Sequence, residues 1–333
     1  MVTPVRGRVP ELRAMLESVR AAADRCPVPV EILVVDDSPP GQAAQHRESC
    51  RRHGARYLRG PRNVGAKRNL GVRHSAYDVL LFVDSDCRVP PGLLGRYAAA
   101  LLDAPAEVAA IAGPTFPEPV PGPVFRLMSG SALLNDDLER PVRLRRVEWA
   151  TTCNLAVRAS AFAAAGGFRT DTIDPVGGED VDLGLRLTAR GQVIACDPGA
   201  VVTHAGAGTG SLPAVLRRFW LYGRSEQWLI TRYPERRRTR LNPVTVTAAA
   251  TVLALLGARR SRRSLWLAPA VAGALLVRDA ARRGGVRAPV LARTLVEWTF
   301  DAGAVSAAVR LRRPDLLLAG FGPATAPERA DGR

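Results

Sequence analysis

The chain has 333 residues, of which 47 are Lys or Arg and 31 are Asp or Glu, giving a formal charge of +16 at pH 7. This length supports one large domain with an appended smaller part and excludes a small scaffold that depends on disulfides. The five cysteines are widely spaced and include no Cys-x-x-Cys pair, so neither a disulfide framework nor a zinc ribbon is expected. We expect reduced thiols, no secretory signal and a cytoplasmic location.

The positive charge has two interpretations. A basic chain can bind nucleic acid by neutralising backbone phosphates. Here Lys67 is the only lysine, and many arginines cluster late in the chain beside apolar stretches, at 236–240, 259–263 and 278–283. This pattern favours anionic lipid head groups over nucleic acid. An arginine-rich composition with no particular partner is the alternative.

Short apolar runs alternate with helical patterns over the first 210 residues, as a sheet built from β-α units requires. A helix is predicted at 10–23, where apolar residues recur at helical spacing. The two clearest strands, 30–35 and 79–83, both end in acidic residues. Because ligands of open α/β sheets bind at the carboxyl ends of the strands, we expect one crevice to receive four carboxylates, those of Asp36, Asp37, Asp84 and Asp86.

From residue 212 the pattern becomes helical, with two apolar segments at 244–257 and 265–277. Both are shorter than the roughly 17–25 residues of a spanning helix, and basic clusters flank them on every side. We expect them to lie in a membrane interface or dip into it, with soluble packed helices as the alternative. The stretch 290–309, which carries Glu297 and Asp301, is predicted to be a packed amphipathic helix.

Two carboxylates two residues apart, Asp84 and Asp86, follow the buried strand 79–83. Hard divalent cations take oxygen ligands and bind through one or two carboxylates plus substrate phosphates, so this pair is suited to Mg²⁺ or Mn²⁺ against a diphosphate. The earlier pair, Asp36 and Asp37, is suited to hydrogen-bonding a ribose or a base. Acidic turn residues without a ligand would give the same pattern.

Two further segments combine glycine with charge. In 63–71, Gly65 permits close backbone approach, and Lys67 and Arg68 offer positive charge to a phosphate where a helix starts. In 177–187, a glycine pair precedes three carboxylates at a predicted helix N-terminus. The helix dipole also favours acidic residues there, so this segment has a structural explanation as well as a chemical one.

In this order, the four segments resemble the family 2 glycosyltransferases, whose catalytic domain has the GT-A fold of nucleotide-diphospho-sugar transferases. The resemblance covers about residues 1–235 and implies an α/β fold with a mostly parallel central sheet. We therefore expect a GT-A domain at 1–235, a helical, arginine-rich and membrane-associating region at 236–320, and a disordered tail at 321–333.

The resemblance also implies roles for individual residues. The segment 35–38 would hold the nucleoside, and Asp84 with Asp86 would coordinate the metal and the donor diphosphate. Asp180 matches the general base, with Glu179 beside it. His204 resembles a histidine near the metal, with a structural histidine as the alternative. The remaining residues are Pro4, Asp36, Asp37, Lys67 and Arg68 on the donor side and Thr152, Asn154, Gly167 and Phe168 on the acceptor side.

The chain departs from the family pattern in two places. Its first strand, at residues 1–6, is shorter than is usual in the family. The Gln-x-x-Arg-Trp element of processive synthases is missing, so single additions are expected. Arg217 and Arg218 lie where that element would fall and are expected to contact the diphosphate or lipid. The run 217–225 is also similar, more loosely, to the glycosyltransferases of mycofactocin-type clusters.

These features predict an inverting transfer of one sugar from a UDP- or GDP-sugar to an acceptor hydroxyl or phosphate, at the cytoplasmic face of the membrane. The acceptor is not identified and is expected to be lipid-linked or peptide-derived. A carboxylate takes the acceptor's proton while a metal stabilises the departing diphosphate. A sugar nucleotidyltransferase is the enzymatic alternative, but its glycine-rich N-terminal loop is missing. The non-enzymatic alternative is a degenerate scaffold that binds a nucleotide without turnover. The retained carboxylates argue against this alternative.

Overall fold

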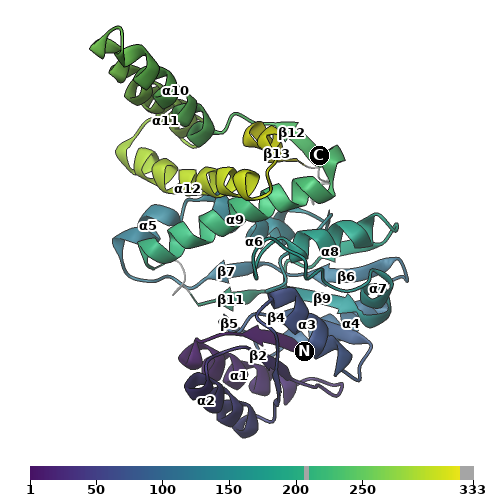
Figure 1. Cartoon of the computed structure of the whole chain (residues 1–333). Helices are drawn as coiled ribbons and strands as arrows, with labels where there is room; N and C mark the ends of the chain where they lie inside the picture. Colours follow the sequence, from purple (N-terminus) through teal and green to yellow (C-terminus); the bar gives the residue numbers. More distant parts are fainter. Residues whose placement is uncertain (206–209, 323–333) are drawn as a thin grey trace. The chain divides into compact units, whose positions relative to one another are not determined.

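The computed structural model describes residues 1–205 and 210–322, which form two compact units (Figure 1). The described parts of the first unit come from residues 1–119 and 134–205. Those of the second unit come from residues 120–133 and 210–322. The predicted disordered tail falls outside the described residues from residue 323 onward, while Phe321 still belongs to a strand.

The first unit alternates strands and helices along the chain, as the sequence predicts. The helix predicted at 10–23 and the strand predicted at 79–83 are confirmed. Its elements are β1 (Val2–Val5), α1 (Val9–Ala23), β2 (Leu33–Asp36), α2 (Pro40–Arg52), β3 (Arg56–Arg59), α3 (Val64–Arg73), β4 (Val79–Val83), β5 (Cys87–Arg88), α4 (Leu93–Asp103), β6 (Val108–Ala112), β7 (Thr115–Pro117), α6 (Ala132–Arg143, which begins in the second unit), β8 (Arg146–Val147), β9 (Asn154–Arg158), α7 (Ala159–Ala164), α8 (Glu179–Thr188), β10 (Val193–Cys196) and β11 (Val202–His204).

The central sheet has eight strands in the order β3-β2-β1-β4-β9-β6-β10-β8. The first four are parallel to one another, while β9 runs antiparallel to both β4 and β6. A second sheet, in the order β5-β11-β7, sets β11 beside β5 so that His204 pairs with Cys87. The predicted α/β fold with a mostly parallel central sheet is confirmed. Strand β2 begins three residues later than expected, since β1 offers it partners only from Val2 to Val5.

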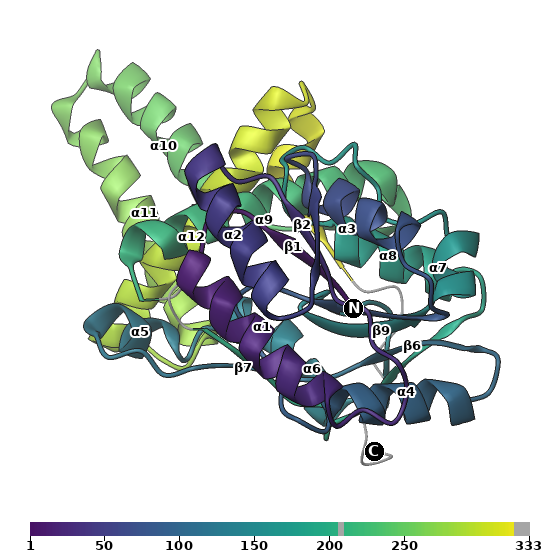
Figure 2. The same ribbon diagram turned by 90° about the horizontal axis from the view of Figure 1, so that it is seen from below.

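Alternation along β4 explains how the sheet is buried on both faces. Leu81 and Val83 belong to one hydrophobic cluster, which α1 and α2 cover (Figures 1 and 2). Leu80 and Phe82 belong to the opposite cluster. Successive side chains of a strand point to opposite faces, so a run of five apolar residues is needed when both faces are covered.

The carboxyl ends of β1, β2 and β4 lie at one edge of the sheet, because these strands are parallel neighbours. The segments that follow them carry Arg6 and Arg8, Asp36 and Asp37, and Asp84. We call this edge the carboxyl edge. The sequence predicts a ligand-binding crevice here.

The second unit is mostly helical, and α9 belongs to it although we expected the first domain to extend to residue 235. Gly223 of α9 and Gly303 of α12 lie so close to the facing backbone that a Cβ at either would overlap it, so the two helices pack at short range (Figure 1). The elements are α5 (Pro123–Met128), α9 (Leu212–Arg232), the 3₁₀ turn Pro234–Arg236, β12 (Arg237–Thr239), α10 (Pro243–Ala258), the 3₁₀ turn Arg262–Trp266, α11 (Leu267–Arg282), α12 (Ala288–Arg310), the 3₁₀ turn Pro314–Leu318 and β13 (Ala319–Phe321).

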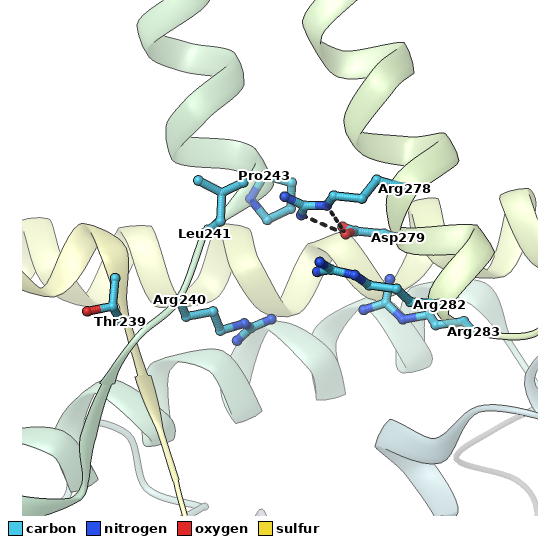
Figure 3. A pocket seen from close by; sticks show the side chains of 8 residues that line it. All are labelled: Thr239, Arg240, Leu241, Pro243, Arg278, Asp279, Arg282 and Arg283. Carbon is cyan, nitrogen blue, oxygen red and sulfur yellow. Dashed lines mark hydrogen bonds and ion pairs between the residues drawn. The ribbon is translucent and has the colours of Figure 1, made fainter.

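The predicted apolar segments form α10 and α11, and the segment predicted at 290–309 forms α12. By length and composition, one helical stretch among the described residues, Arg262–Arg282, could cross a membrane, and 17% of its most apolar window is buried. We expected neither apolar segment to be long enough. The difference arises because a 3₁₀ turn runs directly into α11 and lengthens it. A cavity lined by arginines lies beside the start of α10 and the end of α11 (Figure 3).

Replacing Phe82 by Ala should lower the free energy of unfolding by about 3–5 kcal/mol, because large-to-small changes in a core leave a cavity. The Phe82 ring packs against those of Phe162 and Phe168, with centroids 5.6 and 5.1 Å away. Denaturant unfolding measures the change. Phe116→Ala, on the partly exposed β7, is the matched control and should cost less than about 1 kcal/mol; equal costs would contradict this account of the core.

Candidate functional site

Asp36 anchors the carboxyl edge from inside. Its Oδ1 accepts a hydrogen bond from the backbone N–H of Ser38 at 2.7 Å, and its Oδ2 accepts one from the hydroxyl of Tyr57 at 2.8 Å. His46 Nδ1 lies 3.2 Å from the same Oδ2. Burial alone would raise the pKa of this carboxyl, but the hydrogen bonds from His46, Ser38 and Tyr57 outweigh it and hold the pKa well below its ordinary value. Asp36 is therefore ionised and fixes the loop after β2.

Asp37 is held by two cations. Lys67 Nζ donates to Asp37 Oδ1 at 2.5 Å and to the carbonyl oxygen of Val5 at 2.9 Å. Arg6 Nη1 lies 2.5 Å from Asp37 Oδ2. Burial lowers the pKa of Lys67, and the ion pair with Asp37 partly restores it. Pro4, another predicted donor-side residue, lies in β1 opposite Val35 and is buried. Contacts of these residues with a nucleotide sugar stay predictions.

Arg68 joins two parts of the chain that the sequence keeps far apart. Its Nη2 donates to Asp84 Oδ1 at 2.9 Å and its Nη1 to Glu179 Oε1 at 2.8 Å. The guanidinium is buried and also lies 5.5 Å from the ring centroid of Phe168. Burial alone would lower its pKa, but the carboxylates of Asp84 and Glu179 raise it above the ordinary value. Arg68 thus orders the edge, and contact with a phosphate stays a prediction.

The start of α8 presents Glu179 and Asp180 to the same edge. Glu179 is buried, and its Oε2 accepts a hydrogen bond from the backbone N–H of Gly177 at 2.8 Å. Asp180 is only partly buried, and its Oδ1 accepts a hydrogen bond from the N–H of Val181 at 2.9 Å. Burial and the neighbouring charge of Glu179 raise the pKa of Asp180 to about 7. The two acidic neighbours therefore differ: Glu179 is fixed by Arg68, and Asp180 can take up a proton near neutral pH.

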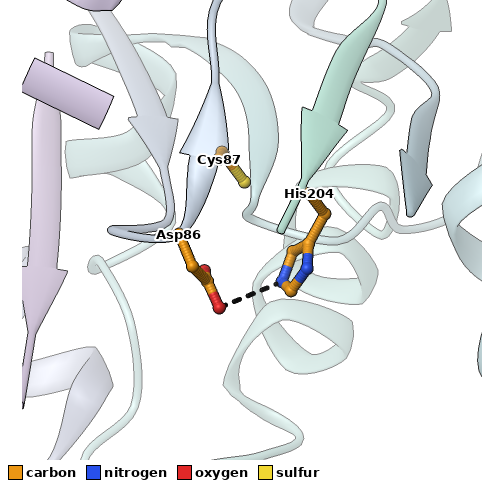
Figure 4. A group of neighbouring side chains, drawn as sticks. All are labelled: Asp86, Cys87 and His204. Atoms are coloured by element: carbon orange, nitrogen blue, oxygen red, sulfur yellow. Dashed lines mark ion pairs between the residues drawn. The ribbon is translucent and has the colours of Figure 1, made fainter. Parts of the chain in front are cut away.

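Asp86, Cys87 and His204 form a cluster in the second sheet, where β5 begins and its neighbour β11 ends. One potential ligand atom from each lies within 4.8 Å of the others, and His204 Nε2 is 3.4 Å from Asp86 Oδ2, as Figure 4 shows. Asp86 Oδ1 is buried without a hydrogen-bond partner. Burial raises the pKa of the Cys87 thiol well above its ordinary value, so this sulfur stays protonated.

The donor set fits a hard divalent cation. A buried carboxylate oxygen that has no hydrogen-bond partner destabilises the fold. A bound cation would coordinate this oxygen and remove that cost. The imidazole of His204 is a second donor of the cluster, whereas the partly exposed carboxylate of Asp84, two residues before Asp86, pairs with Arg68. Cys87 does not fit, since Mg²⁺ and Mn²⁺ prefer oxygen and the thiol is neutral. Asp86 and His204 are therefore candidate ligands, and metal binding by these two residues and by Asp84 stays a prediction.

The predicted acceptor-side residues lie inside the first unit. Asn154 is fully buried: its Nδ2 donates to the carbonyl oxygens of Pro114 and Ala200, and its Oδ1 accepts from Tyr97. These three bonds tie β9 to its surroundings.

The other acceptor-side residues have similar surroundings. Thr152 and Phe168 are buried. The Asn69 side chain receives a hydrogen bond from the N–H of Phe168 and donates to its carbonyl oxygen. Gly167 has a φ of 68° and no room for a Cβ beside Asn69. These contacts position the backbone, and contact with an acceptor stays a prediction. Arg217 and Arg218 lie on α9 of the second unit.

Sequence reasoning missed Arg8. Its guanidinium pairs with Asp86 Oδ2, and its backbone is left-handed, with φ of 59° and ψ of 46°. A non-glycine residue in this region is uncommon and often marks a functional site. The signal in the sequence is slight: two arginines flank Gly7 directly after the first strand, and the N–H of Gly7 donates to Ser38 Oγ at 2.8 Å.

Residues 1–158 match the family model described as glycosyl transferase family 2, and this part of the chain belongs to that family. The fold is GT-A: the mannosyltransferase PcManGT from Pyrobaculum calidifontis, solved with GDP-Man and Mn²⁺, superposes with a TM-score of 0.54. That alignment covers 93% of this chain and 85% of the other at 19% identity, which shows the fold alone.

Two curated relatives are the pre-mycofactocin glycosyltransferases of Mycobacterium tuberculosis strains CDC 1551 and H37Rv. Each is 30% identical over 250 residues, which is 71% of this chain. The chain spans about half the length of these relatives, 48% of each.

Arg68→Met should lower the free energy of unfolding by about 3–5 kcal/mol, because it leaves buried Glu179 and its neighbour Asp84 without their counter-charge. Denaturant unfolding measures the loss. Arg73→Gln, exposed on the same helix, is the control and should change stability by less than about 0.5 kcal/mol. If Arg68→Met is as stable as this control, Arg68 does not order the edge.

Asp180 should make the protein less stable as the pH rises. Its pKa is about 7 in the folded protein against 3.8 for an isolated side chain, so the folded state binds this proton more tightly. The contribution is fully present below pH 3.8 and is lost as the pH rises through about 7. Asp180→Asn should therefore gain stability relative to the parent as the pH rises from about 4 to about 7. A stability difference between variant and parent that does not change across that range would contradict the raised pKa.

Proposed function

We propose that this protein transfers a single sugar from a nucleotide diphosphate sugar to an acceptor hydroxyl or phosphate, with inversion at the anomeric carbon and with a divalent cation. The observation that carries the proposal is the separation of two kinds of carboxylate at one edge. Asp84 and Asp86 lie where a diphosphate-bound cation is expected, while Asp180 has its pKa raised to about 7.

Asp180 is assigned the general base. A base acts best when its pKa is close to the working pH, because it then is largely ionised and still takes the proton readily. The acceptor oxygen loses its proton to Asp180 as it forms the new bond to the anomeric carbon. The bond from that carbon to the diphosphate oxygen breaks on the opposite face. Glu179 stays paired with Arg68 and raises the pKa of its neighbour.

Asp84, Asp86 and His204 are assigned to hold Mn²⁺ or Mg²⁺, which when bound would neutralise charge on the departing nucleoside diphosphate. The solved mannosyltransferase of the same fold contains Mn²⁺ and GDP-Man, which supports this assignment. On the donor side, Asp36 fixes the loop after β2, and Asp37, which pairs with Lys67 and Arg6, is assigned to contact the nucleoside.

The acceptor is proposed to be lipid-linked or peptide-derived. Similarity to pre-mycofactocin glycosyltransferases makes pre-mycofactocin one acceptor to test. The exposed apolar residues of α10 and α11 support work at the cytoplasmic face of a membrane, where Arg217 and Arg218 would contact a diphosphate or lipid. We propose single additions rather than polymerisation.

Purified protein should release nucleoside diphosphate slowly from one member of a panel of UDP-, GDP- and TDP-sugars when Mn²⁺ is present, and not with chelator. Asp86→Ala and Asp180→Asn should each lower transfer by about 10²–10⁴-fold, since each removes a group that acts in the transition state. Asp103→Asn, exposed at the end of α4, is the matched control. Turnover that survives Asp180→Asn would refute the assigned base; metal-independent turnover would refute the cation.

A further inference from the structure

A cavity of about 340 Å³ lies within the second unit, where β12 leads into α10 and α11 ends. Figure 3 shows the guanidinium groups of Arg240 and Arg282 reaching into the same space from opposite sides. The lining is dominated by arginine, with one carboxylate and two apolar side chains: Thr239, Arg240, Leu241, Pro243, Arg278, Asp279, Arg282 and Arg283.

Carboxylates set behind the lining orient these arginines. Arg240 Nη2 lies 2.8 Å from Asp301 Oδ1, and Arg283 Nε lies 3.0 Å from Glu297 Oε2. Both α12 carboxylates are almost completely buried and do not line the cavity. They fix the guanidinium planes and leave the cavity itself basic.

The ion pairs leave donors unused. A guanidinium carries five N–H donors, and a single carboxylate engages two of them at most. Arg278 donates hydrogen bonds from Nε and Nη2 to Asp279 Oδ1. Arg283 Nη1 is buried and has no hydrogen-bond partner, and Arg282 is exposed and forms no ion pair with a described residue. An oxyanion with several acceptor oxygens, such as a phosphate group, matches this fork geometry.

Apolar surface continues from the cavity along both helices. Large apolar side chains on α10, α11 and the turn between them are exposed, with Trp266 the most exposed at 75%. At 16 residues each, α10 and α11 are about 24 Å long. Exposed apolar patches of this kind mark a binding surface. The exposed residues are Val252, Leu253, Leu255, Leu256, Leu265, Trp266, Leu267 and Val277.

More arginines lie at the far end of these helices. Arg259, Arg260, Arg262 and Arg263 are exposed in and beside the turn between α10 and α11. Basic residues therefore stand at both ends of an apolar surface, and basic clusters beside such a surface attract anionic lipid head groups.

We propose that this cavity binds the phosphate group of an anionic membrane lipid, while α10 and α11 lie in the interface beside its acyl chains. The ligand pairs oxygens with the unused donors of Arg278, Arg282 and Arg283. All the residues of this site lie in the second unit, and none of them is assigned a part in the sugar-transfer chemistry.

Flotation of the full chain with vesicles tests the proposal. Binding should be strong to phosphatidylcholine vesicles that contain phosphatidic acid and weak to phosphatidylcholine alone. Arg282→Gln should weaken it by about tenfold, the loss expected for a charged hydrogen bond of about 1.5 kcal/mol. Arg310→Gln, exposed at the end of α12, and Arg260→Gln, at the far end, remove the same charge outside the cavity.

Equal losses in all three variants would show general attraction between charges and overturn the cavity site. Unchanged binding by Arg282→Gln and by Arg278→Gln would overturn it as well. If inorganic phosphate or glycerol phosphate stabilises the protein against heat in a way that depends on Arg282, but vesicles are not bound, the lipid source is wrong. Release of nucleoside diphosphate in solution should be the same for all four variants, which separates this test from that of the transferase.

Discussion

The carboxyl edge depends on one buried contact, the guanidinium of Arg68 between Asp84 and Glu179. These carboxylates come from two segments almost a hundred residues apart, after β4 and at the start of α8. Arg68 pairs with both carboxylates and so supplies the positive charge between them. Burial and the neighbouring charge of Glu179 raise the pKa of Asp180 to about 7. Arg68 therefore distinguishes the carboxylates: Asp84 and Glu179 pair with it, and Asp180 does not.

The fold could be predicted from local patterns because the strands that matter are short, apolar and end in acidic residues. The run from Val79 to Val83 could only be a strand buried on both faces, and Asp84 follows directly from its end. Family likeness then placed Glu179 and Asp180 at the same edge. The boundary of the second unit could not be predicted in this way, since it depends on how closely Gly223 and Gly303 let two helices approach.

The site was harder to predict than the fold because burial decides what a charged residue does. Lys67 and Arg68 follow a glycine at the start of a helix, and this pattern predicts contact with a phosphate. In the structure both side chains are buried and form ion pairs with carboxylates. In the sequence, Asn154 is a polar residue that could contact a ligand. In the structure, its Nδ2 and its Oδ1 both form hydrogen bonds within the protein. A single sequence does not show which polar side chains face inward, since the partners come from distant segments.

The left-handed backbone at Arg8 has a thermodynamic consequence for the whole edge. Such a conformation costs about 1–3 kcal/mol in a residue with a side chain, and the ion pair with Asp86 helps to maintain it. The same short loop holds Asp37 through Arg6 and Ser38 through Gly7. Whatever binds Asp86 in place of Arg8 frees the loop to relax and changes the surroundings of Asp37. We therefore expect occupancy at one carboxylate to be coupled to affinity at the other, and such a coupling is reciprocal.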